Sequence, residues 1–229
     1  MLATLLCVIL PGIDPGATVN QVQVTYRAGG DLSASFKQTY VDKMRGKTRV
    51  ESGKMWVKKD GRVRWSYREP TAKDFVFDGK TAYFYEPENA QVTVFDRFRD
   101  SPIAGAMQFL WGQGELAKSF DISACSRDCP APASGEAVVQ LVPKTALAAV
   151  EHIALVVDPK AGRVRRSVVY DPLGNRTEYQ FDDLQFGATV DDAKFAFTVP
   201  TGVSVLRAAA DGSLAPKADP AAKPDAAKP

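Results

Sequence analysis

The chain has 229 residues, of which 45% are hydrophobic and 24% charged, and this composition is typical of a globular protein and excludes wholesale disorder. The formal net charge of +2 is too small to indicate a nucleic-acid-binding protein. Two local basic clusters alternate with other residues, as the outer face of a strand does, and predict solvated faces: Lys43, Arg45, Lys47 and Arg49, and then Arg163, Arg165 and Arg166.

The sequence nominates no active site. It contains one histidine and three cysteines, and their spacing with the acidic residues matches no metal site, Ser-His-Asp set or glycine-rich phosphate loop. His152 lies in the alternating stretch 150–153, which predicts an imidazole on a strand surface. We therefore expect no catalytic residue, no metal and no cofactor, and a protein that is not an enzyme.

The amino-terminal stretch 2–10 is a short apolar run that ends at Pro11-Gly12. It is too short to span a bilayer, which takes about 20 residues, but it suits the hydrophobic region of a secretory signal peptide. No Lys or Arg precedes it, and a start codon placed too far downstream would explain their absence. Residues 1–17 are thus predicted to be a truncated signal peptide, with a buried amino-terminal strand as the alternative.

A helix followed by two strands comes next. Val19, Val22 and Tyr26 have the spacing of one helix face within 18–27, and Gly29-Gly30 ends the pattern. Strands are predicted at 32–41 and 50–58.

The stretch 53–98 alternates apolar and polar residues between turn signals such as Asp60-Gly61 and Asp78-Gly79. This pattern predicts consecutive antiparallel hairpins, with strands at 63–67, 75–77, 81–85 and 92–95 and one strongly apolar face.

A helix is predicted to begin at Pro102, a residue favoured in the first helical turn. Its apolar stripe consists of Ile103, Met107, Leu110 and Trp111, and a second short helical piece contains Leu116 and Phe120. The stripe could belong to a core helix or to a lid over a cavity, and periodicity alone favours the core helix.

Cys125 and Cys129 lie in a turn-rich loop, where two nearby cysteines of an exported protein most simply form a local disulfide. Further strands are predicted at 137–142, 151–157, 164–170, 177–186 and 194–199. Residues 208–229 are mostly Ala, Pro, Lys and Asp, and this composition predicts a disordered tail.

About ten successive strands without βαβ alternation predict a large antiparallel sheet, curved or rolled into a partial barrel, with helices on its concave side. The aromatic interior of such a sheet either fills with its own side chains or leaves a pocket for an apolar ligand. Patterning does not decide between these two.

Several stretches resemble the LolA family of periplasmic outer-membrane lipoprotein carriers. They are MWVKKDGRVRWSYREP, FDGKTAYFYEPENAQV and AKFAFTVPTGVSVL, together with Leu32-Ser-Ala-Ser-Phe36-Lys-Gln38. The resemblance covers residues 19–205 approximately, and its most specific part is Asp78-Gly79-Lys80-Thr81 followed by an aromatic strand. It implies a mainly β fold in which an unclosed antiparallel half-barrel (residues 18–207), covered by short helices, encloses a hydrophobic cavity.

The resemblance also implies an activity. A monomer in the periplasm of a Gram-negative bacterium would accept the acyl chains of lipoproteins released by an inner-membrane ABC transporter and pass them to an outer-membrane acceptor. The alternatives are a lipid- or lipoprotein-binding envelope sensor with the same fold and an enzyme acting on an envelope lipid. The absence of a nominated nucleophile or base disfavours the enzyme.

Site residues follow from the resemblance by position. The acyl-chain cavity is expected to contain Val63, Trp65, Tyr67, Phe75 and Phe77. The resemblance makes the stripe of Ile103, Met107, Leu110 and Trp111 a lid. The family's arginine, which holds the lid through backbone carbonyls, is replaced by Lys59, so the latch is expected to be weaker or made differently.

Overall fold

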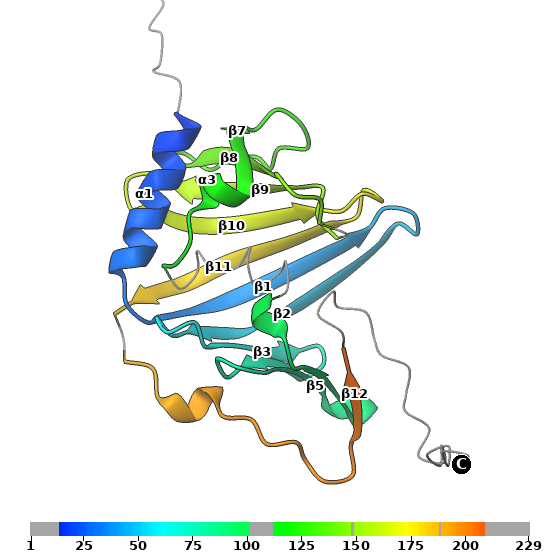
Figure 1. Cartoon of the computed structure of the whole chain (residues 1–229). Coiled ribbons are helices and arrows are strands. Elements are labelled where there is room, and N and C mark those ends of the chain that lie inside the picture. Colours follow the sequence, from blue (N-terminus) through cyan, green and yellow to red (C-terminus); the bar gives the residue numbers. More distant parts are fainter. Residues whose placement is uncertain (1–13, 101–111, 148, 188, 209–229) are drawn as a thin grey trace, which may run out of the picture. The chain divides into compact units, whose positions relative to one another are not determined.

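The computed structural model (Figure 1) describes residues 14–100, 112–147, 149–187 and 189–208. The predicted lid and most of the predicted signal peptide and tail lie outside these residues. In the described part of the chain, no helix is both long and apolar enough to cross a membrane.

Twelve strands of the described residues form one sheet, in the order β12-β6-β5-β4-β3-β2-β1-β11-β10-β9-β8-β7. The sheet is open, with β12 and β7 at its edges, and it is mainly antiparallel, although β12 runs parallel to β6. The predicted unclosed antiparallel sheet with few, short helices is confirmed. The strands are β1 (Leu32–Asp42), β2 (Lys47–Val57), β3 (Val63–Glu69), β4 (Lys73–Phe77), β5 (Ala82–Glu86), β6 (Gln91–Phe95), β7 (Phe120–Ala124), β8 (Ala137–Pro143), β9 (His152–Asp158), β10 (Arg163–Tyr170), β11 (Arg176–Phe186) and β12 (Ser204–Arg207).

Two compact units share the described residues. The first unit contains residues 14–29, 37–50, 112–147 and 149–182, and the second contains residues 30–36, 51–100, 183–187 and 189–208.

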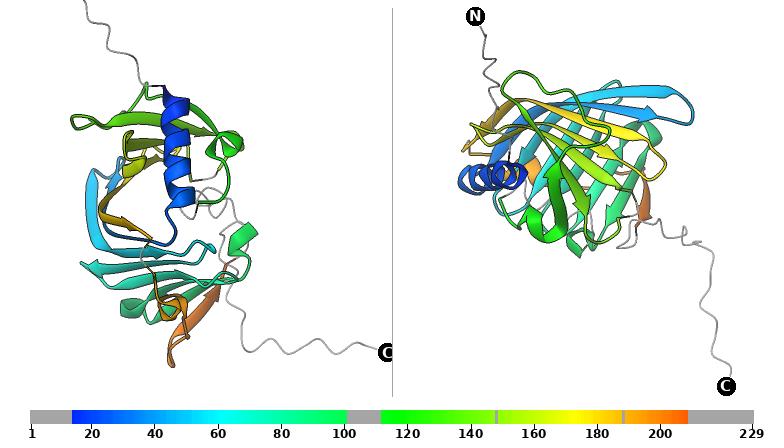
Figure 2. Two further views of the ribbon diagram at one scale, coloured as in Figure 1. Left: turned by 90° about the vertical axis from the view of Figure 1, so that its left-hand side faces the viewer. Right: turned by 90° about the horizontal axis from the view of Figure 1, so that it is seen from above.

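The first unit packs helix α1 (Pro15–Ala28) against β7, β8 and β10 (Figure 2). Val19, Val22 and Tyr26 are buried, as their helical spacing predicts. The helix begins at Pro15 and not at the predicted Thr18, because the Asp14 carboxylate accepts hydrogen bonds from the first free backbone N–H groups and proline suits the first turn.

One strand of the first unit was missed by the sequence analysis. The predicted helical piece around Leu116 and Phe120 is only the four-residue helix α3 (Leu116–Ser119). Phe120 instead begins β7, which pairs with β8. Leu116 and Phe120 are both buried, one in the short helix and the other at the start of the strand. Their spacing of four residues also fits one face of a longer helix, so periodicity wrongly predicted a helix through Phe120.

The second unit is built on the predicted meander of β2 to β6, but its carboxyl-terminal part differs from the prediction. Residues 194–199 form no strand, and η4 (Asp192–Phe195) is a short 3-10 helix. Phe197 packs on Tyr83 and Tyr85, with ring centroids 5.0 and 5.7 Å apart, and Lys194 lies over the Trp56 ring. The segment therefore covers one face of the sheet and leaves the edge pairing to β12, which the sequence analysis did not predict.

Gly53 lies where the register between β2 and β3 shifts. A Cβ atom on this residue would overlap the carbonyl oxygen of Ser66 and lie 2.9 Å from the Cα of Tyr67. The backbones of β2 and β3 can come this close together only because residue 53 has no side chain.

We predict that Gly53→Ala lowers the free energy of unfolding by about 2 kcal/mol or more, because backbone atoms must move to admit the methyl group. The measurement is urea denaturation followed by circular dichroism. Gly46→Ala is the matched control, since Gly46 has φ +61° but open space around it, and it should lose only about 1 kcal/mol. Equal losses in the two variants would contradict this role of Gly53.

Candidate functional site

The five predicted cavity residues share one face of β3 and β4. Trp65 pairs with Phe75, and Val63 pairs with Phe77. Tyr67 pairs with Lys73 one step further along the same strands. Directly paired residues point to the same side of a sheet, and alternate residues of a strand do as well, so the five side chains form one surface.

This surface, which we call the aromatic face, continues onto the neighbouring strands. Met55 and Val57 of β2 pair with Trp65 and Val63, whereas Phe84 of β5 pairs with Phe75. Phe95 of β6 follows through its pairing with Ala82. Phe84 and Phe95 were not among the cavity residues predicted from the sequence. Alternation along 82–85 places Phe84 and its tyrosine neighbours on opposite faces of the sheet. Only the register between strands shows that Phe84 is on the same face as Trp65.

Two phenylalanines from outside the meander pack on the aromatic face. Phe36 of β1 meets Trp65 and Tyr67 edge to face, with centroid distances of 5.4 and 4.9 Å. Phe98 of η2 (Phe98–Asp100) packs on Phe75 and Phe77, at 5.2 and 5.1 Å. These tilted arrangements are the ones that aromatic pairs favour.

Burial divides the predicted residues into two groups. Val63, Phe77 and Tyr67 are 0%, 1% and 8% exposed and belong to the core of the second unit. Trp65 and Phe75 are only half-buried, as is Phe84 beside them. The half-buried rings are the part of the aromatic face that has surface left to contact a ligand.

One end of the aromatic face carries an ion pair. The Nζ of Lys73 lies 2.6 Å from a carboxylate oxygen of Glu51 and 4.4 Å from the centroid of the Tyr67 ring. The two charged side chains are only 16% and 6% exposed. Because the charges compensate each other and the ammonium also lies over a ring, this end is polar without a net charge.

Of the predicted lid and latch, only the latch residue, Lys59, lies among the described residues. Ile103, Met107, Leu110 and Trp111 lie outside them. Lys59 is exposed in the turn between β2 and β3, and its backbone N–H donates to Asp31, 3.1 Å away. The role of Lys59 as a latch stays a prediction.

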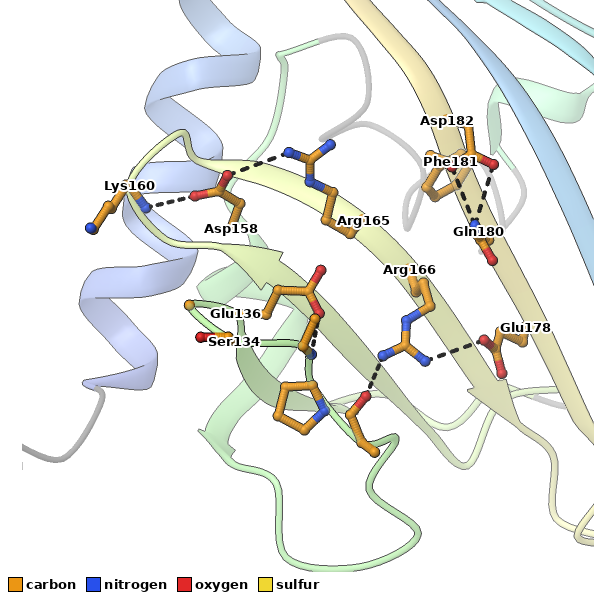
Figure 3. Close-up of a pocket in the computed structure, with 14 residues that line it drawn as sticks. Ser134, Glu136, Asp158, Lys160, Arg165, Arg166, Glu178, Gln180, Phe181 and Asp182 are labelled. Carbon is orange, nitrogen blue, oxygen red and sulfur yellow. Dashed lines mark hydrogen bonds and ion pairs between the residues drawn. The ribbon is translucent and has the colours of Figure 1, made fainter.

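A second candidate site, in the first unit, is an open pocket of about 790 Å³ (Figure 3). Its charged lining residues are Glu136, Asp158, Lys160, Arg165, Arg166, Glu178 and Asp182.

Most of these charges already have partners inside the pocket. Arg166 binds Glu178 and the carbonyl of Ala131, and Arg165 pairs with Asp158 (Figure 3). Paired charges line much of this pocket, and Arg166 links the loop at Ala131 to β10. The aromatic face therefore remains the candidate site for an acyl chain.

The loop beside this pocket contains a disulfide between Cys125 and Cys129, whose Cα atoms are 5.8 Å apart. The Tyr170 hydroxyl donates to the backbone carbonyl of Asp128, and Arg127 forms an ion pair with Glu151 at 2.9 Å. The small disulfide ring is thus fastened to β10 and to the start of β9.

His152 lies under this loop, so the prediction of a surface imidazole is wrong. The residue is 1% exposed and stacks on Tyr170, with ring centroids 4.4 Å apart and planes 9° from parallel. Strand alternation cannot show that a distant loop covers this face.

Burial lowers the pKa of His152, and the nearby Arg127 guanidinium lowers it further. Arg127 donates to Nδ1 over 3.4 Å, so the ring proton resides on Nε2, which has no hydrogen-bond partner among the described residues. A neutral, buried imidazole of this kind is a structural group. No cluster of metal-ligating side chains occurs in the part of the chain that the structure describes.

Comparison with known proteins identifies the class to which this sheet and its aromatic face belong. The family model described as "Outer membrane lipoprotein carrier protein LolA" matches residues 30–198. The chain therefore belongs to the LolA family, as its sequence motifs suggested.

Curated relatives agree with this assignment. The outer-membrane lipoprotein carrier protein of Methylobacillus flagellatus is 25% identical over 82% of this chain and 88% of its own length. The protein of the same name from Bordetella pertussis is 30% identical over 76% of this chain and 79% of its own length. Among solved structures, an uncharacterized conserved protein from Thermus thermophilus has a TM-score of 0.51 at 9% identity, covering 83% of this chain and 96% of that protein. This last likeness concerns the fold alone.

We predict that stability falls as the pH drops below about 6.5, because the unfolded chain binds a proton at residue 152 more readily than the folded chain does. Urea denaturation at pH values of about 7.5 and about 5.5, on either side of the ordinary histidine pKa, measures the change. His152→Phe, which can retain the stack on Tyr170, should lose less stability between these two pH values than the native chain, and His152→Gln serves if the phenylalanine variant misfolds. The same pH response in native and variant chains would contradict the assignment, since His152 is the only histidine.

Proposed function

We propose that this protein is a periplasmic carrier that receives the acyl chains of lipoproteins leaving the inner membrane and delivers them to an acceptor at the outer membrane. The observation that carries the proposal is the aromatic face, with Trp65, Phe75 and Phe84 half-buried on three adjacent strands. Family membership and the names of the curated relatives support the same function.

The need for a carrier follows from the hydrophobic effect. Removing one CH₂ group from water is favourable by about 0.8 kcal/mol of transfer free energy. An acylated protein therefore meets a very large free-energy barrier if its acyl chains cross an aqueous compartment unshielded. Large aromatic side chains offer apolar area with few rotatable bonds, and therefore take up acyl chains at a small entropic cost.

Delivery requires that binding be reversible. We propose that the chains move down a gradient of affinity, from an ABC transporter in the inner membrane, through this protein, to an acceptor that binds them more tightly. Such a gradient needs no catalytic step on this chain. The predicted lid of residues 102–111 would shield the bound chains, and Lys59 would hold that lid closed.

The aromatic face supplies a matched pair of variants for testing ligand binding. Phe84 and Tyr85 are neighbours on β5, both half-buried, and they point to opposite sides of the sheet. Tyr85 packs on Phe197, whereas Phe84 lies on the aromatic face.

We predict that Phe84→Ser weakens binding of a triacylated lipopeptide by about tenfold, because the ring no longer contributes apolar contact. Tyr85→Ser should leave this affinity within about twofold of the native value while lowering stability to a similar extent. Tryptophan fluorescence titration measures both affinities, and the same peptide without acyl chains is the ligand control. Similar losses of affinity in the two variants would show that the aromatic face is not the binding surface.

A release experiment tests the transport function directly. The protein is added to spheroplasts that carry a labelled lipoprotein destined for the outer membrane. We expect the lipoprotein in the supernatant as a one-to-one complex with the native protein, and markedly less with Phe84→Ser than with Tyr85→Ser. Binding of the lipopeptide without any release of lipoprotein would instead favour an envelope sensor that binds lipid.

A further inference from the structure

Two adjacent turns of the first unit expose large apolar side chains to solvent. Met44, in the turn between β1 and β2, is 84% exposed, and Leu173, in the turn between β10 and β11, is 69% exposed. These are the two most exposed large apolar side chains in the described part of the chain. Burial of neither one contributes to the fold.

The two turns are in contact with each other. The backbone N–H of Lys43 donates to the side-chain oxygen of Asn175 over 3.1 Å. The aliphatic stem of Lys43 also lies against Gly174, where an added Cβ would come within 2.9 Å of it. Both turns lie at the same end of their strands in Figure 1. Met44 and Leu173 therefore project from one composite tip, which we define as residues 42–49 and 171–175.

The composite tip is rich in positive charge. Lys43, Arg45, Lys47 and Arg49 are all exposed, and the strand pattern of the sequence had identified them only as a solvated face. The acidic residues of the composite tip itself are Asp42 and Asp171. Asp42 already binds Arg45 at 3.1 Å, and the Asp171 carboxylate accepts three hydrogen bonds from within its own turn.

The shape of the tip favours a lipid surface over a protein partner. A stable protein interface buries about 800 Å² on each side around a packed core, whereas two tight turns with single projecting side chains offer far less area. A bilayer accepts isolated apolar side chains at the boundary between headgroups and acyl chains, and anionic headgroups attract flanking Lys and Arg side chains. Methionine suits such a boundary because its side chain is flexible and polarizable.

We propose that the composite tip docks this protein on the anionic surface of a phospholipid bilayer. Met44 and Leu173 enter the boundary between headgroups and acyl chains, and Lys43 and Lys47 contact the headgroups from either side of the β1–β2 turn. The aromatic face takes no part in this contact, so docking does not depend on the proposed carrier function.

The test is sedimentation of the full-length chain with vesicles of phosphatidylcholine that contain about 30% phosphatidylglycerol or none, at low and at physiological salt. We expect binding to the anionic vesicles only, weakened by salt because exposed charges are screened. Lys43→Glu with Lys47→Glu should reduce the binding constant at least about 25-fold, at about fivefold for each cation removed. Met44→Ser with Leu173→Ser should reduce it about tenfold at either salt concentration.

Matched controls separate local docking from general electrostatics. Arg97→Glu with Lys118→Glu changes the net charge by the same amount at two exposed cations outside the tip, and Val24→Ser with Val205→Ser removes exposed apolar side chains elsewhere. Both pairs should bind like the native chain. All variants keep the apolar run 2–10, which therefore contributes equally, and urea midpoints confirm folding.

Three outcomes would overturn the proposal. One is the absence of binding to anionic vesicles at low salt, and another is an equal loss in the control and tip variants. The third is binding of an acidic protein to the tip residues in the absence of any binding to vesicles. That result would make the tip a site of contact with a protein partner.

Discussion

Cross-strand register in the β2–β5 meander is the constraint on which the candidate site depends. Trp65 opposes Phe75, and Phe75 opposes Phe84, so three rings from separate strands share one surface. A slip of one residue would turn these rings away and bring Arg64 and Asp74 to their place, because side chains alternate with a period of two. Gly53 admits the close approach of β2 and β3 from which this register begins.

Segments from outside the meander pack on both of its faces. On one face, Phe197 and Lys194 cover the tyrosines of β5 and the indole of Trp56. On the other, Phe36 and Phe98 bury part of the aromatic face but leave Trp65 and Phe75 half-buried. Tyr83, Tyr85 and Trp56 are half-buried as well. The aromatic face differs because Trp65, Phe75 and Phe84 lie opposite one another on three adjacent strands, whereas Trp56 and Tyr83 are separated by Arg64 and Val76.

The segments whose structure differs from the prediction do so for one physical reason. Residues 194–199 alternate like a strand yet cover a face, and His152 alternates like a surface residue yet lies beneath the disulfide loop. In both places the local pattern indicates an extended backbone with one apolar side. It does not report which distant segment provides the partner, since that depends on contacts between residues far apart in sequence.

Local sequence patterns were enough to predict the open antiparallel sheet, the turns, the amphipathic helix α1, the family and the shared face of Val63, Trp65, Tyr67, Phe75 and Phe77. These depend on short-range periodicity, on turn residues such as Asp-Gly, and on local motifs. Four further features came only from the folded chain: which of these rings are buried and which keep exposed surface, the place of Phe84 beside them, the ion pair of Lys73 and Glu51, and the shared tip of Met44 and Leu173. Each of these depends on register or on contacts between distant strands, which local alternation leaves undetermined.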